Sequence, residues 1–286
     1  MARQGTNLLI PQTLVDLFEG SALGAIALTV FLALVVSAML GYFARRIPRW
    51  IWPAETQDVG QEAAVVAAVL GLLALLLGFT FSLALDRYEQ RRMLVLQESN
   101  AIGTAYLRTQ LLSEPFRTDL SATLHDYTRL RIGLAGQHDA DFASRLARSD
   151  ALLVTMWQQT LAAERSEGPN PTGSLHVASI NEVIDLDAAR KYARMAKVPS
   201  AVYAALLVNL MISAAILGYV IFGFWARMSA VLLFVLFTLS FLLIIDIDRP
   251  LTGRLREQQT PMISLLEFMN VNPPGRFGPG EGAAGP

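Results

Sequence analysis

The sequence lacks cysteine altogether and contains little charge. The absence of cysteine among the 286 residues excludes a disulfide framework, a thiolate metal site and a cysteine nucleophile. Charged residues make up only 16% of the chain, whereas soluble globular proteins contain about 25%. A net charge of -1 argues against a nucleic-acid partner, because binding to phosphates requires a basic surface. The Gly-rich phosphate loop, HExxH and GxSxG motifs are also missing. We therefore expect no enzymatic activity, no cofactor and no metal site.

Long uncharged runs take the place of the missing charge. Four stretches carry no formal charge: residues 20–44, 63–85, 198–226 and 228–245. Each supplies the roughly 20 apolar residues that cross a bilayer as a helix. None has the polar stripe of a helix in a water-soluble bundle, and the first is too long for the apolar core of a cleaved signal peptide. The runs predict an all-α polytopic membrane protein with four transmembrane helices.

The spans divide the chain into six expected segments. Basic residues near the span ends place both termini and the central block in the cytoplasm, with the protein in the inner or plasma membrane, although Arg45, Arg46 and Arg49 lie in the opposite loop. The segments are an N-terminal segment (1–19), transmembrane helices 1 and 2 (20–86), a cytoplasmic helical domain (87–197), transmembrane helices 3 and 4 (198–247), a cytoplasmic C-terminal segment (248–272) and a disordered tail (273–286). The tail is too poor in apolar residues to fold alone.

The central block is predicted to be helical. Proline is absent from 86 to 112, so the second span is expected to continue as a helix beyond the membrane. Ser113-Glu114-Pro115 then predicts a break, because proline is favoured in the first turn of a new helix. Further helices are expected at 116–134, 141–165 and 174–198, with a stop at residues 168–171.

Polar residues of the central block indicate no catalytic or metal centre. The histidines are far apart in the sequence, so we expect surface or packing roles for His125, His138 and His176. Three acidic residues of one helix are expected to form a solvated face: Glu182, Asp185 and Asp187.

The inner half of the second span carries the most informative pattern. At helical spacing, one face presents Gly71, Leu75, Phe79, Leu83 and Asp86. Such a stripe, ending in charge at the water boundary, can line an oligomeric pore whose apolar constriction gates by dewetting. The alternative is a helix–helix packing seam, in which Gly71 and Gly78 allow close approach. Spacing alone favours the seam.

The same region resembles a known family. Residues 77–88, Leu-Gly-Phe-Thr-Phe-Ser-Leu-Ala-Leu-Asp-Arg-Tyr, are similar to the second transmembrane segment of bestrophins, whose bacterial members carry an Ala-x-Asp-Arg-aromatic run. Ala84, Asp86, Arg87 and Tyr88 match that run. Residues 247–253 resemble the acidic-Pro-x-Gly segment after the last bestrophin span. Residues 86–108 and 179–186 look like the signature of a bestrophin-like family of bacterial and plant membrane proteins.

The resemblance implies a homopentameric channel for chloride or other small anions, with the second span around the axis. Phe79 would be the neck aromatic, and Leu75 and Gly71 would follow one and two turns outward, with Leu83 on the same stripe. Bestrophin necks tend to carry a bulky residue at each turn, whereas Gly71 would leave its level wide.

The resemblance also implies an inner pore boundary, formed here by Asp86, Arg87 and Arg91. Because charges at a membrane boundary are normally compensated, Asp86 is expected to pair with Arg87 or Arg91 of a neighbouring copy. No acidic run follows Pro250, so the calcium clasp of animal bestrophins is not expected.

A second functional hypothesis is a non-conducting membrane sensor or scaffold that signals through its cytoplasmic helical domain. Helices that continue from the second span and lead into the third would suit it equally well. A membrane enzyme is disfavoured, because the spans offer only scattered polar residues. The expected partners are the lipid bilayer, small anions and further copies of the chain, with no nucleic acid.

Overall fold

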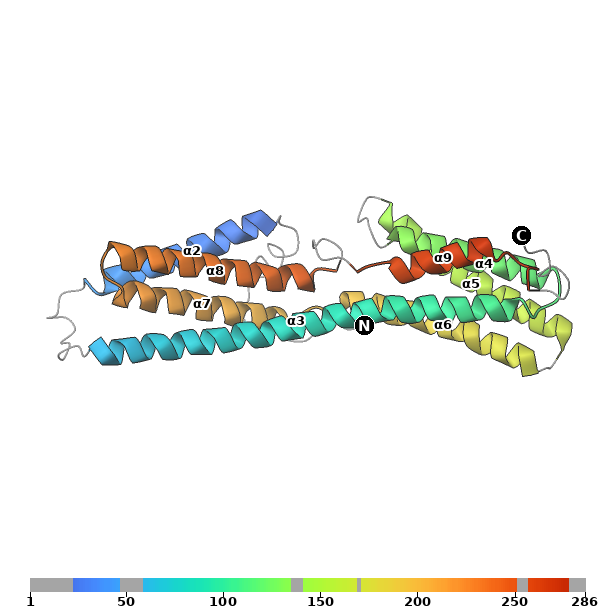
Figure 1. The fold of residues 1–286 in the computed structure, drawn as a ribbon, viewed down its shortest axis with the longest axis horizontal. Helices are drawn as coiled ribbons and strands as arrows, with labels where there is room; N and C mark the ends of the chain where they lie inside the picture. Colours follow the sequence, from blue (N-terminus) through green and yellow to red (C-terminus); the bar gives the residue numbers. More distant parts are fainter. Residues whose placement is uncertain (1–22, 47–58, 135–140, 169–170, 251–256, 278–286) are drawn as a thin grey trace, which may run out of the picture. The chain divides into compact units, whose positions relative to one another are not determined.

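The computed structural model describes residues 23–46, 59–134, 141–168, 171–250 and 257–277. All regular elements in these ranges are helices (Figure 1), so the all-α prediction is confirmed. The helices are α2 (Leu23–Ala44), α3 (Val59–Thr109), α4 (Phe116–Leu134), α5 (Phe142–Glu167), α6 (Pro171–Met195), α7 (Ser200–Val220), α8 (Phe224–Asp248) and α9 (Thr260–Val271).

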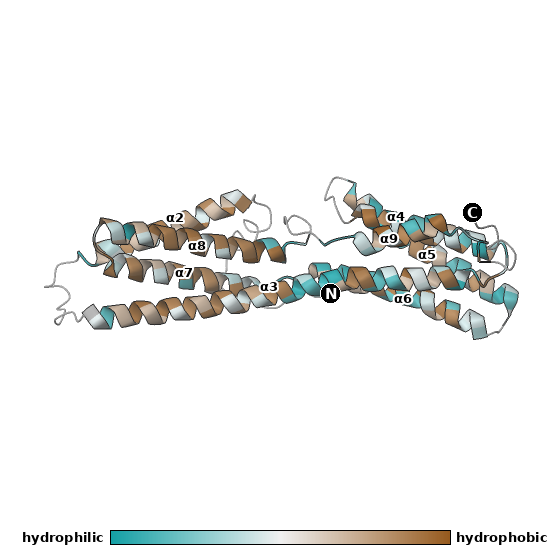
Figure 2. Ribbon diagram, in the orientation of Figure 1, coloured by the Kyte–Doolittle hydropathy of each residue, from teal (hydrophilic) through white to brown (hydrophobic). Residues whose placement is uncertain are grey.

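The chain forms two compact units. The first unit contains residues 1–86 and 197–249, and the second contains residues 87–196 and 250–286. Within the described residues, four helices are long and apolar enough to cross a membrane, as predicted: α2, α3, α7 and α8. Figure 2 shows the contrast in composition, because the helices of the first unit are almost uniformly hydrophobic and those of the second alternate between polar and apolar residues.

Within the first unit, α2 packs against α7 and α8. The contact between α2 and α7 is so close that it requires glycine on both sides. A Cβ atom added to Gly41 would lie 1.9 Å from the carbonyl oxygen of Ala215, and one added to Gly218 would lie 2.0 Å from that of Ala38. Small residues allow the two backbones to touch, which is how helices in a bilayer gain van der Waals contact without a hydrophobic driving force.

The boundary between the last two spans lies earlier than the charge at Arg227 indicated. α7 ends at Val220, and a short connection leads to Gly223, whose φ of 86° is an angle that glycine adopts without strain. At the other end of this pair, the Asp248 carboxylate accepts hydrogen bonds from the Val198 N–H (3.1 Å) and the Tyr203 hydroxyl (3.1 Å). Asp248 thereby ties the end of α8 to the start of α7.

Within the second unit, α4 packs against α5 and α9, and α5 packs against α6. α4 has the predicted bounds, whereas α6 begins at Pro171, which the sequence had assigned to a stop; proline fits the first turn because its missing N–H has no helical acceptor there. The core is apolar and draws on every helix of the unit; its fully buried members include Ile102, Leu124, Met156, Ile180 and Met262. α9 therefore belongs to the core of this unit.

Candidate functional site

The stripe predicted on the second span lies on an exposed face of α3. Leu75 is 54% exposed and Phe79 is 66% exposed, while Leu83 is half-buried. Gly71 faces open space, since an added Cβ would meet nothing within 4 Å. The structure thus places these residues on one face that the described part of the chain leaves largely uncovered.

The opposite face of α3 is buried within the first unit. Leu73, Thr80 and Ala84 are each at most 5% exposed, and the Thr80 hydroxyl donates to the Leu76 carbonyl (2.7 Å). Nevertheless, only 11% of the most apolar window of α3 is buried, against 22% for α2 and 28% for the windows of the other two spans. α3 is the span that its own chain covers least.

The two glycines of the alternative seam make no close contact with the described residues. A Cβ added to Gly71 or Gly78 would meet nothing within 4 Å, unlike one added to Gly41 or Gly218. If Gly71 and Gly78 permit a close approach, the approaching helix must therefore come from outside the described part of this chain.

The charges after the stripe differ in their surroundings. Asp86 is exposed, and no ion pair joins it to another described residue. Arg87 is half-buried, and its Nε has no hydrogen-bond partner among the described residues. Arg91 is 2% exposed, with its Nε 3.6 Å from Glu257 Oε1. The pairing of Asp86 with a neighbouring copy stays a prediction.

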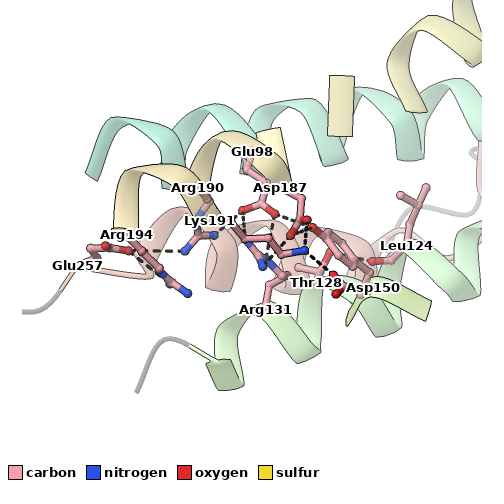
Figure 3. A network of polar contacts seen from close by, with 11 residues as sticks. Glu98, Leu124, Thr128, Arg131, Asp150, Asp187, Arg190, Lys191, Arg194 and Glu257 are labelled. Carbon is pink, nitrogen blue, oxygen red and sulfur yellow. Dashed lines mark hydrogen bonds and ion pairs between the residues drawn. The ribbon is translucent and has the colours of Figure 1, made fainter. Parts of the chain in front are cut away.

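A buried network of charges holds the second unit together (Figure 3). Glu98 of α3 is completely buried and bonds three residues from two other helices. Arg131 of α4 lies 3.0 Å from it (Nε to Oε1), Tyr127 donates to it at 2.8 Å, and Arg190 of α6 donates from Nη1 to Oε2. Arg131 also bonds Asp187 of α6 at 2.9 Å (Nη1 to Oδ1).

The network continues to the segment that precedes α9. Glu257 Oε2 lies 3.7 Å from Arg190 Nη2 and 3.5 Å from Arg194 Nη2. At the other end, Lys191 bridges Asp187, at 2.6 Å, and Asp150 of α5. Charges contributed by α3, α4, α5, α6 and the segment before α9 therefore meet in one continuous set of contacts.

The contacts within the network favour the ionised form of Glu98. Burial tends to raise the pKa of Glu98, but attraction to Arg131 and Arg190, with hydrogen bonds from Arg190 and Tyr127, holds that pKa below its ordinary value. Burial and the neighbouring Glu98 charge raise the pKa of Tyr127 well above its usual range. Glu98 thus stays ionised and Tyr127 stays a hydrogen-bond donor at neutral pH.

Sequence reasoning missed this network. Glu182 and Asp185 are exposed, as expected, but Asp187 is 3% exposed, so the prediction of a solvated face is wrong for that residue. Asp187 lies on the side of α6 that also carries the buried Val183 and Arg190, and this spacing of three and four residues was the available signal.

The histidines serve different roles. His176 is completely buried, and burial lowers its pKa to about 4. His125 shares a hydrogen bond with the Asn270 side chain (2.9 Å), while His138 lies outside the described residues. Among the residues that the structure describes, no group of three or more His, Asp or Glu side chains could hold a metal ion.

Comparisons with known proteins agree with this architecture. The sequence model of a family described as "Bestrophin-like domain" matches residues 29–262. Crystal structures of a bacterial bestrophin homologue from Klebsiella pneumoniae match the fold. A tryptophan-to-alanine variant has a TM-score of 0.63 at 14% identity, covering 88% of this chain and 97% of that one.

Two further structures of the Klebsiella pneumoniae homologue give similar values. A tyrosine-to-alanine variant has a TM-score of 0.60 at 14% identity, over 85% of this chain and 97% of that one. A structure obtained by zinc phasing has a TM-score of 0.58 at 15% identity, over 83% and 94%. At these identities the likeness concerns the fold. No curated protein matched the sequence.

Proposed function

We propose that this chain, which belongs to the bestrophin-like family, assembles into a homopentameric channel that conducts chloride or other small anions through a pore lined by α3. The observation that carries the proposal is the exposed stripe of α3 on the span least covered by its own chain. Copies arranged around a common axis would cover the flanks of α3 and leave the stripe facing that axis.

Lipid alone could also cover an apolar face, but two features of α3 favour neighbouring copies. Gly78, which is not part of the stripe, offers space for the close approach of another helix, and no described residue of the chain fills it. α3 is also the least buried span, whereas α2 and α7 bury part of their surfaces against each other at the close contacts of Gly41 and Gly218. The first unit therefore presents a face of α3 for contacts that the described part of the chain does not provide.

Conduction would depend on an apolar constriction. Phe79 and Leu75 lie one turn apart, and rings of these side chains from several copies would form a neck that excludes water when narrow. Gly71, one further turn outward, would leave a wider entrance. The proposed mechanism is passive conduction, opened by rearrangement of the helices around the neck.

The surroundings of Arg87 and Arg91 indicate which of the two pairs with Asp86. Asp86 facing the axis would repel anions, so we propose that it contacts an arginine of a neighbouring copy. Arg91 is buried next to Glu257, whereas Arg87 is half-buried with an Nε that lacks a hydrogen-bond partner among the described residues. Arg87 is therefore the better partner for Asp86.

The decisive experiment is the reversal potential of purified protein in planar bilayers under a KCl gradient. Reversal near the chloride equilibrium potential supports an anion channel. Reversal near the potassium potential keeps the channel but refutes anion selectivity. If the folded protein gives no current, the proposal of conduction is refuted.

The neck has its own test. Phe79→Ala should raise the leak conductance, because it removes the largest apolar side chain of the stripe. Phe224→Ala is the matched control, since Phe224 is equally exposed (66%) but lies at the start of α8. Equal conductance of the two variants and the unmodified channel would show that Phe79 does not line the neck.

The second candidate is a non-conducting sensor or scaffold. It is favoured by the unbroken course of α3 from Val59 to Thr109, which gives one helix residues in both units. A change in the membrane part of such a helix can alter the surface of the second unit without any ion flow. The absence of current in the bilayer experiment, together with binding of a partner by the second unit, would favour this candidate.

The proposed orientation has both termini and the second unit in the cytoplasm. The sequence contains no cysteine, so single-cysteine variants can be labelled without background. Arg148→Cys, on the exposed surface of α5, should react with an impermeant maleimide only after the membrane is opened. Labelling of Arg148→Cys in intact cells would reverse the orientation.

A further inference from the structure

Two arginines flank one tyrosine at the end of the first unit where α2 ends and α8 begins. The guanidinium carbon of Arg46 lies 4.6 Å from the centroid of the Tyr42 ring, and that of Arg227 lies 5.0 Å from it. Arg46 also donates a hydrogen bond from Nη2 to the Tyr42 hydroxyl. Both positive charges therefore lie next to the same aromatic ring.

No carboxylate compensates these two charges within the described residues. Neither Arg46 nor Arg227 forms an ion pair there, and both side chains belong to exposed residues. The neighbouring Arg45 is different: it lies 3.7 Å from Glu62, donates to the Tyr219 carbonyl (3.0 Å) and stacks 3.8 Å above the ring of Phe222. Among the described residues, Glu62 thus pairs with Arg45, and the two arginines on Tyr42 have a surplus of positive charge.

The surroundings of the pair are those of a membrane interface. Trp225 is 82% exposed and Phe224 is 66% exposed in the first turn of α8, and Phe43 of α2 is 54% exposed. Exposed aromatic residues at the end of a span are typical of the headgroup level of a bilayer. α2 and α8 pack against each other next to this site and expose apolar side chains, including Leu40 (64%) and Leu232 (62%).

We propose that Arg46 and Arg227 bind the phosphate of an anionic phospholipid whose acyl chains lie along α2 and α8. Guanidinium groups match phosphate oxygens in charge and in paired hydrogen-bond geometry. The surplus positive charge favours a headgroup with net negative charge over a zwitterionic one. Free phosphate would gain nothing from the exposed aromatic and apolar residues beside the arginines, so the lipid fits the whole surface better.

Native mass spectrometry of the purified oligomer, after incubation with phosphatidylglycerol or phosphatidylcholine, tests this site. The unmodified protein should retain phosphatidylglycerol in preference to phosphatidylcholine. The double variant Arg46→Gln/Arg227→Gln should lose at least four-fifths of the retained phosphatidylglycerol. The control Arg129→Gln/Arg148→Gln, which removes two exposed charges from α4 and α5, should retain it in full.

Three results would overturn the proposal. The first is equal retention of phosphatidylglycerol by the double glutamine variant and the control. The second is inorganic phosphate displacing phosphatidylglycerol at millimolar concentration, which would identify a free-anion site. The third is equal retention of phosphatidylglycerol and phosphatidylcholine by the unmodified protein, which would show that the two arginines do not select an anionic headgroup. None of these readouts depends on whether the protein conducts ions.

Discussion

The buried network of the second unit makes a quantitative prediction possible for Glu98→Gln. Glutamine has nearly the same size and shape as glutamate, so the substitution opens no cavity. It removes the negative charge that Arg131 and Arg190 both contact, and it places an amide group where only acceptors are suitable. The hydrogen bond from Tyr127 can survive, because the amide oxygen still accepts. The loss is therefore mainly electrostatic.

The magnitude follows from the burial of the partners. Glu98 is 0% exposed and both arginines are 2% exposed, so water cannot solvate the charges that remain. Removing one member of a buried ion pair typically destabilises a protein by about 3–5 kcal/mol. For a unit of this size, each kcal/mol lowers Tm by about 2–4 °C. Glu98→Gln should therefore lower the Tm of the second unit by roughly 6–20 °C.

The measurement is thermal unfolding of the purified protein in detergent, followed by circular dichroism. Glu89→Gln on the same helix is the control, because it breaks an ion pair with Arg92 in which both side chains are about half exposed. An exposed pair contributes at most about 1 kcal/mol, so the control should stay within about 2–4 °C of the unmodified protein. If Glu98→Gln unfolds at the temperature of the control, the network does not stabilise the unit.

Three further outcomes are expected. Gly41→Leu should prevent folding of the first unit, while Gly71→Leu should leave its Tm unchanged and reduce the proposed current, as measured by unfolding and bilayer recording. Asp248→Asn should lower the Tm, because two hydrogen bonds then lose their charged acceptor. His176 has a folded pKa of about 4 against 6.5 unfolded, chiefly because burial disfavours its charge; Glu167 opposes this shift and Arg108 adds to it. The unfolded state therefore binds the extra proton first, and stability should fall from pH 6.5 to pH 4 by about 1–3 kcal/mol, a loss that His176→Leu should abolish.

Features that depend on local sequence were predictable. The four spans follow from uncharged runs of sufficient length, and the start of α4 follows from Pro115. The boundary at Gly223 was harder, because a single glycine within an apolar run does not distinguish a turn from a continuing helix. The charge at Arg227 was a misleading marker, since an arginine can lie inside the first turn of a span that begins at the interface.

Features that depend on packing between distant segments were not predictable. Asp187 and Glu182 both lie on α6. Asp187 is buried because it contacts Arg131 of α4, whereas Glu182 is exposed. Glu257 follows the last span, and nothing in its sequence neighbourhood indicates that arginines of α3 and α6 surround it. The stripe of α3 was predicted as a set of residues sharing a face, but periodicity does not say what that face meets.

The glycines of the first unit separate what the chain completes by itself from what it leaves for a neighbour. A glycine inside a helix destabilises it by roughly 0.5–1 kcal/mol relative to alanine. At Gly41 and Gly218 that loss is offset within the chain, because α2 and α7 touch where a Cβ would collide with a carbonyl. At Gly71 and Gly78, in the middle of α3, no described residue uses the space that the missing side chains leave. The offset for these two glycines therefore does not come from the described part of the chain. In the proposed pore, Gly71 would face the axis, and a neighbouring copy packed beside α3 would use the space at Gly78.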